Sequence, residues 1–133
     1  MPLKVSNAIL CDHVRVEDNG KHILIGVYAG DIVLHSFPGA FAPTFWLQFA
    51  TEAANEELDL ELRIDGPDGV NPTTAKLMAR SGEDRGALVI ANAGPFLYQA
   101  PGKITCQVRQ KGGRWMPVLS KGVIRASSTP PSS

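Results

Sequence analysis

The stretch NAILCDHVRVEDNGKHILIGVYAGDIVL, residues 7–34, decides the fold because two apolar runs meet in it at Asn19-Gly20. Both residues tolerate the positive φ angles of a two-residue type I′ turn, so the stretch predicts a β-hairpin. One face is predicted to pair Val16/Ile23, Val14/Ile25, Asp12/Val27 and Leu10/Ala29. The other face is predicted to pair Glu17/His22, Arg15/Leu24, His13/Gly26 and Cys11/Tyr28. The first face is apolar apart from one carboxylate, and we expect it to be buried.

Asp12 is that carboxylate, and the predicted register makes it a structural buried carboxylate among Leu10, Val14 and Val27. A buried carboxylate needs hydrogen-bond partners, so we expect loop amides or a basic side chain to bind it and lock the hairpin to a neighbouring strand. The alternative is a catalytic carboxylate with a raised pKa. No second acid or base stands at a spacing that would pair with Asp12.

The remaining sequence predicts further short strands separated by turns rich in Gly, Pro and Asp. Residues 58–65 alternate most regularly, with Leu and Ile on one side and charged residues on the other. The predicted strands lie at 44–50, 58–65, 73–79, 87–91, 96–98, 103–110 and 115–125. Without an amphipathic helix, the pattern predicts an all-β, two-sheet antiparallel β-sandwich of about 8–9 strands in residues 1–126. A partly closed β-barrel is the alternative, and residues 127–133, SSTPPSS, are predicted to be a disordered tail.

Composition indicates one ordinary globular domain. The chain has 133 residues, of which 44% are hydrophobic and 20% charged, enough for a core without metal or disulfide support. Cys11 and Cys106 are expected to be reduced, and the N-terminus does not have the pattern of a signal peptide, which favours a cytoplasmic protein. No apolar run approaches 18 residues, so no membrane-spanning helix is predicted.

Charge is divided unevenly along a chain whose net charge is zero. Residues 1–84 hold all 13 acids and six bases, a net charge of −7, and residues 85–133 hold seven bases and no acid. The absence of net repulsion makes self-association plausible. The basic tip around Arg109 and Trp115 suggests a nucleic-acid surface, but Trp115 is predicted to point inward. We expect instead that basic strands compensate acidic ones, for example Arg109 or Lys121 beside Asp59 and Glu61.

The segments Cys11-Asp12-His13-Val14-Arg15, Gly20-Lys21 and Leu24-Ile25-Gly26-Val27-Tyr28 resemble a group of small bacterial proteins known only as a domain of unknown function. The turn Ala100-Pro101-Gly102-Lys103-Ile104 is similar to one that is widespread in β-sandwich modules. The resemblance implies a sandwich and implies no activity.

The mixed face of the first hairpin holds the candidate site residues. His13, Arg15, Tyr28 and His22 are the candidate ligand-binding set, suited to a small molecule or a carbohydrate. A Cys11/His13 nucleophile pair, or a metal site in which His22 or His35 joins them, is the catalytic alternative. No metal-ligand spacing supports that alternative, and no phosphate-binding glycine pattern predicts a cofactor.

Three functional hypotheses follow. The first is a non-catalytic structural or protein-interaction module that binds itself or another protein, suggested by aromatic and apolar residues on second faces of strands: Tyr28, Trp46, Met116 and Val118. The second is a small-ligand or carbohydrate-binding sandwich, and the third is a hydrolase or metal enzyme at Cys11/His13. The first is preferred, which predicts no catalysis and neither a nucleic-acid nor a membrane partner.

Overall fold

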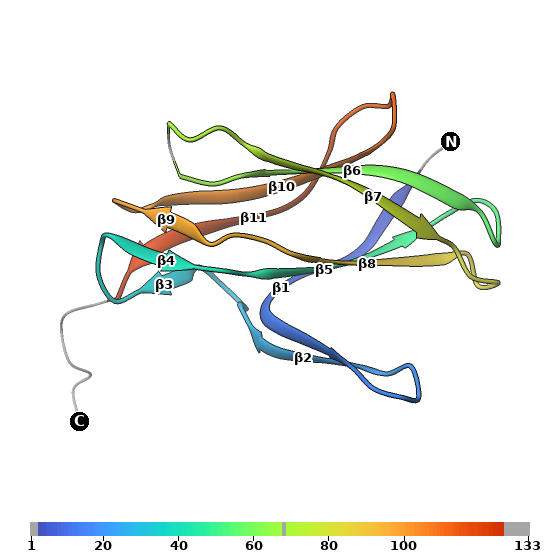
Figure 1. The fold of residues 1–133 in the computed structure, drawn as a ribbon, viewed down its shortest axis with the longest axis horizontal. Helices are drawn as coiled ribbons and strands as arrows, with labels where there is room; N and C mark the ends of the chain where they lie inside the picture. The colour runs from blue at the N-terminus through green and yellow to red at the C-terminus, as the bar shows by residue number, and fades with distance from the viewer. Residues whose placement is uncertain (1–2, 68, 127–133) are drawn as a thin grey trace.

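The computed structural model describes residues 3–67 and 69–126, so the tail predicted at 127–133 lies outside the described residues. Within them the chain is all-β and contains no helix, as predicted (Figure 1). The strands are β1 (Lys4–Val16), β2 (His22–Val27), β3 (Ile32–Leu34), β4 (Gly39–Phe41), β5 (Thr44–Ala50), β6 (Glu57–Asp65), β7 (Thr73–Arg80), β8 (Gly86–Asn92), β9 (Phe96–Tyr98), β10 (Gly102–Gln110) and β11 (Met116–Arg125). No helix long and apolar enough to cross a membrane occurs in the described part of the chain.

The strands form three sheets. One has the order β2-β1-β5-β8, the second β3-β11-β10-β6-β7, and β4 pairs with β9 in a small third sheet. The second sheet is mixed because β3 runs parallel to β11, and it curls into a half-barrel. The three-residue strands β3 and β4 raise the number of strands in the described residues to 11, above the predicted 8–9. The all-β class was confirmed, and the wholly antiparallel pairing was wrong at β3.

The core lies between the four-stranded and the five-stranded sheets. Alternate residues of β5, β6 and β10 are buried against one another: Phe45, Leu47, Phe49, Leu58, Leu60, Leu62, Ile64, Ile104, Cys106 and Val108. The alternation of residues 58–65 therefore predicted the buried side of β6 correctly. Cys11 and Cys106 are both free thiols, as expected, and both are buried.

The first hairpin forms, but its register differs from the prediction by one residue. Glu17 N–H donates to Lys21 C=O at 2.8 Å and Gly20 N–H donates to Glu17 C=O at 2.9 Å, so the loop has three residues and not two. Gly20 takes a φ of 83°. The resulting pairs are Val16/His22, Arg15/Ile23, Val14/Leu24, His13/Ile25 and Cys11/Val27. A shift of one residue exchanges which side chains share a face.

The distal half of this hairpin, residues 12–27, is called the arm here because it projects from the sandwich (Figure 1). Strand β1 turns sharply midway, and its second half runs with β2 away from the body. Among the described strands only β1 pairs with β2, and none of the other sheets is layered on the arm. The predicted burial of the apolar stripe is therefore wrong: Val16, Ile23, Ile25 and Val27 are 43–57% exposed.

Candidate functional site

Asp12 lies at the base of the arm and is exposed, so its predicted burial is wrong. The bend of β1 carries it out of the region that the five-stranded sheet covers. Its carboxylate lies over Gly26, where an added Cβ would overlap Oδ2 and come within 2.8 Å of Cγ. Its Oδ1 accepts a hydrogen bond of 2.6 Å from the Tyr28 hydroxyl. Asp12 thus holds the two ends of the bend together, but from outside the core.

Burial and this bond to Asp12 raise the pKa of Tyr28 to about 12. Burial acts first, and the neighbouring negative charge adds to it because ionising the phenol would place two anions side by side. Tyr28 is therefore a neutral hydrogen-bond donor at ordinary pH. It was predicted as a ligand-binding residue, and the structure engages its hydroxyl with Asp12.

The other predicted ligand-binding residues have different surroundings. His22 Nδ1 accepts a hydrogen bond of 3.0 Å from Trp46 Nε1 on β5, with the two rings edge to face at 6.3 Å. Arg15 pairs with Glu17 at 3.3 Å. His13 is exposed and opposes Ile25. The structure therefore brings His22 to Trp46 and Tyr28 to Asp12, and it does not gather the four predicted side chains around one point.

Cys11 lies inside the molecule, whereas it was predicted on the mixed outer face of the hairpin. It is fully buried, and its thiol lies 3.6 Å from the carbonyl oxygen of His13 and 3.7 Å from that of Thr44. Burial raises the pKa of this thiol, which disfavours the thiolate that a nucleophile or a metal ligand requires. No group of three or more His, Cys, Asp or Glu side chains able to hold a metal occurs among the described residues.

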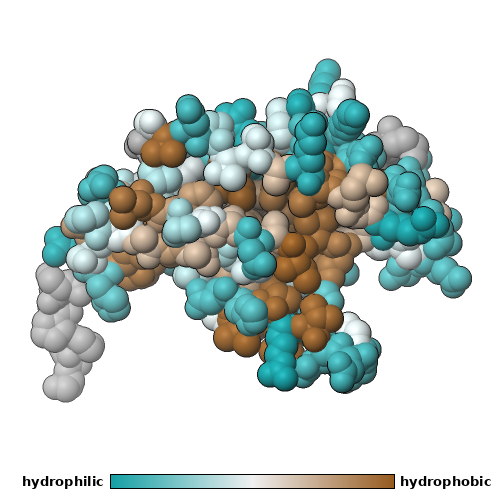
Figure 2. All heavy atoms as spheres, viewed as in Figure 1, coloured by the Kyte–Doolittle hydropathy of each residue, from teal (hydrophilic) through white to brown (hydrophobic). Residues whose placement is uncertain are grey.

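The arm instead presents an apolar surface, formed by Ile23, Ile25 and Val27 and called the β2 surface below. Figure 2 shows hydrophobic side chains on the part of the molecule that hangs below the body. These three residues alternate along β2, so they project from the same side of that strand. Contiguous exposed apolar groups on a projecting element are typical of binding surfaces.

Strand β2 is also an edge strand with an open row of backbone groups. Proteins usually protect such edges with lysine, proline or very short strands. Edge strand β7 carries Lys76 and Arg80, and edge strand β3 has three residues. From His22 to Val27, β2 has neither a formal charge nor a proline. It is thus less protected than β3 and β7, and it shares the absence of charge and proline with β8, the other edge of its own sheet.

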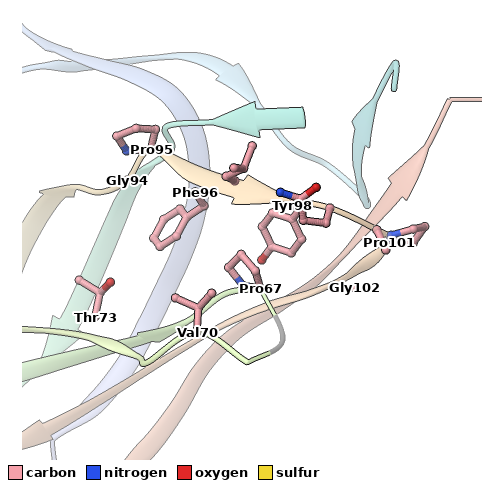
Figure 3. Close-up of a pocket in the computed structure, with 12 residues that line it drawn as sticks. Pro67, Val70, Thr73, Gly94, Pro95, Phe96, Tyr98, Pro101 and Gly102 are labelled. Carbon is pink, nitrogen blue, oxygen red and sulfur yellow. The ribbon is translucent and has the colours of Figure 1, made fainter. Parts of the chain in front are cut away.

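A second feature is a groove of about 510 Å³ at the end of the sandwich beside β9. Figure 3 shows the rings of Phe96 and Tyr98 pointing from β9 toward Pro67 and Val70. Apolar side chains, including Pro67, Val70, Pro95, Leu97 and Pro101, make up much of its lining. The Tyr98 hydroxyl donates to the carbonyl oxygen of Lys103 at 2.7 Å, which fixes that ring in the wall.

The basic C-terminal third is compensated as predicted at one position. Arg109 binds Glu61 through two hydrogen bonds of 3.2 and 3.3 Å between β10 and β6. Its guanidinium also lies 4.3 Å from the ring centre of Trp115. Arg109 and Trp115, the core of the suggested nucleic-acid surface, are therefore engaged with partners inside the chain.

Comparison with protein families matches residues 6–114 to a family of unknown function, DUF6941. The chain belongs to DUF6941. The match confirms the resemblance that the segments of residues 11–28 suggested, and it covers the arm and strands of both main sheets. No curated protein matches the chain.

Two features of this DUF6941 chain were not predicted from its sequence. The β2 surface was assigned to the core because alternation identifies an apolar side of a strand and not what covers it. The groove joins Pro67, Val70 and Thr73 to residues 94–102, which are distant in sequence. The three prolines in its lining were interpreted only as turn residues, and no local pattern predicts that these turns meet.

Proposed function

We propose that this DUF6941 chain is a non-catalytic protein-interaction module that binds its partner through the arm. The supporting observation is the combination of an uncharged edge strand with the β2 surface on the same projecting element. An open edge accepts an extended strand through backbone hydrogen bonds, and apolar side chains beside it add contact area. The arm offers both.

Energetics favour a partner on this surface. Covering the exposed half of an isoleucine or valine is worth on the order of 1 kcal/mol, at about 25 cal/mol per Å². Three such side chains lie together on one face of the arm, so a covered arm is more favourable than a solvated one. The hydrogen bond from Trp46 to His22 helps to hold the arm in place, which lowers the entropic cost of binding.

The test is site-specific photo-cross-linking in cells that express the chain. A photoreactive phenylalanine analogue replaces Ile25 on β2, and in a control it replaces Met78, which is 68% exposed on β7. We expect one discrete cross-linked protein from position 25, lost when Ile23→Lys is added, and none from position 78. Equal products from both positions, or none from position 25, would show that the arm is not a binding surface.

The groove beside β9 supports a second candidate function, the binding of a small apolar molecule. Its volume of about 510 Å³ lies within the range of ligand sites. Leu97, which is exposed in its lining, is the position for a blocking substitution. A ligand that raises the melting temperature of the wild type but not of Leu97→Trp would support this function, and a screen of apolar ligands without such a hit would contradict it.

A further inference from the structure

We infer that the partner of β2 is the β2 strand of a second copy of this chain, paired antiparallel about a two-fold axis at Leu24. This inference rests on the proposed function of the arm and names its partner. The two four-stranded sheets would then join edge to edge into one eight-stranded sheet. A two-fold contact uses the same surface on both copies and closes on itself, so it yields a dimer and not a filament.

The backbone of the arm places the axis. Glu17 N–H donates to Lys21 C=O, so alternate residues from Lys21 onward turn their backbone groups toward β1. The backbone groups of His22 and Leu24 then face the open edge. Gly26, with a φ of 69°, interrupts the regular strand beyond that point. Leu24 is therefore the residue of the regular edge best placed to oppose its own copy.

The side chains match in this register. With Leu24 opposite Leu24, Ile23 of one copy lies beside Ile25 of the other, and the same contact repeats across the axis. Four half-exposed isoleucine side chains then cover one another on one face of the joined sheet. The β2 surface is thus self-complementary.

Charge favours a second copy over an oppositely charged partner. No residue from His22 to Val27 carries a formal charge, and the charge of Arg15 is paired with Glu17. The whole chain has a net charge of zero, so two copies meet without net repulsion. A partner recognised by charge would find little to bind on this edge.

The contact area predicts a weak dimer. A six-residue strand and three half-exposed side chains per copy bury less than the about 800 Å² per partner of a standard interface. We expect a Kd of roughly 10–100 µM, in the range of transient complexes.

Sedimentation velocity of the full chain from about 1 to 500 µM tests the inference over that range. The wild type should pass from monomer to dimer, and Ile25→Lys should weaken dimerisation at least about tenfold, the cost of placing a charge in the contact. The control Met78→Lys puts the same charge on an exposed apolar position of β7 and should leave the Kd unchanged. Circular dichroism establishes that each variant is folded. A wild type that stays monomeric, or two variants with equal effects, would overturn the inference.

Disulfide trapping tests the register. Paired positions without mutual backbone hydrogen bonds suit a disulfide, so a mixture of Ile23→Cys with Ile25→Cys should cross-link faster than either variant alone. The native cysteines are buried, and the wild type is the control. Faster linkage of Ile25→Cys to itself would overturn the axis at Leu24. A monomeric wild type together with a specific cross-link from position 25 to a different protein would contradict self-pairing and leave the proposed function of the arm standing.

Discussion

Gly26 is the residue that allows β1 to bend, because its missing side chain makes room for the Asp12 carboxylate. Its φ of 69° already costs other residues about 1–2 kcal/mol. Gly26→Ala should therefore lower the free energy of unfolding by roughly 2–3 kcal/mol, since it also displaces the carboxylate from Tyr28. Urea titration measures the loss.

The matched control for this prediction is Gly20→Ala at the tip of the arm. Gly20 has a φ of 83°, but an added Cβ meets no atom within 4 Å, so only the backbone cost of about 1–2 kcal/mol applies. Equal losses in the two variants would show that the position of Asp12 over Gly26 does not constrain the fold.

Ionisation of Tyr28 makes the free energy of unfolding depend on pH in the alkaline range. Its pKa of about 12 in the folded chain lies above the ordinary value of 10.0, so the unfolded chain ionises first as the pH rises. Its contribution is complete below pH 10 and is lost as the pH rises toward 12. Tyr28→Phe should be less stable than the wild type by about 1 kcal/mol at pH 8, and the difference should shrink from pH 10 upward.

Thermal unfolding between pH 8 and pH 11.5 measures this difference. Burial also raises the pKa of Cys106 to about 12, but that thiol is present in both proteins and affects them alike. A difference between wild type and Tyr28→Phe that stays constant with pH would contradict the role assigned to the Tyr28–Asp12 bond.

The first hairpin shows that the sequence predicts the position of a turn but not the length of its loop. Asn19-Gly20 identified the turn, but the pair suits both a two-residue and a three-residue loop. In the three-residue loop that forms, the Asn19 side chain accepts a hydrogen bond of 3.1 Å from the backbone N–H of Lys21. That single extra residue exchanged the faces of the arm. Strand β6 needed no loop to set its sides, and its alternation alone predicted them.

The contact between Trp46 and His22 ties the arm to the four-stranded sheet. Trp46→Phe keeps an aromatic ring but removes the Nε1–H donor, a loss of about 1 kcal/mol. Amide hydrogen exchange of Ile23 and Ile25, whose backbone groups face β1, should then quicken five- to tenfold, while β6 and β10 exchange as before. Trp115→Phe is the control, because Trp115 stacks with Arg109 and should leave the arm unchanged. Equal exchange of the arm in both variants would show that Trp46 does not hold it.

In the folded molecule, a basic side chain of the C-terminal third lies beside an acidic side chain of the rest of the chain. Strand β10 of the basic third lies between β6 and β11, which brings Arg109 to Glu61. The sequence predicted this compensation from charge alone. It did not predict that one apolar stripe would lie outside the sandwich, because burial depends on which sheets face each other.

The core and the β2 surface lie in different parts of the molecule, so separate substitutions can change the stability of the fold and its association. Leu62 is 1% exposed between the sheets, and Leu62→Ala should cost about 2–5 kcal/mol through the cavity it leaves. Ile25→Lys removes no packed core contact, so it should change the free energy of unfolding by less than about 0.5 kcal/mol in dilute solution, where the chain is monomeric. Chemical denaturation at about 1 µM, below the expected Kd, measures the free energy of unfolding of the monomer alone. A loss comparable to that of Leu62→Ala would mean that the β2 surface stabilises the monomer itself, and its exposure would then require an explanation other than a binding partner.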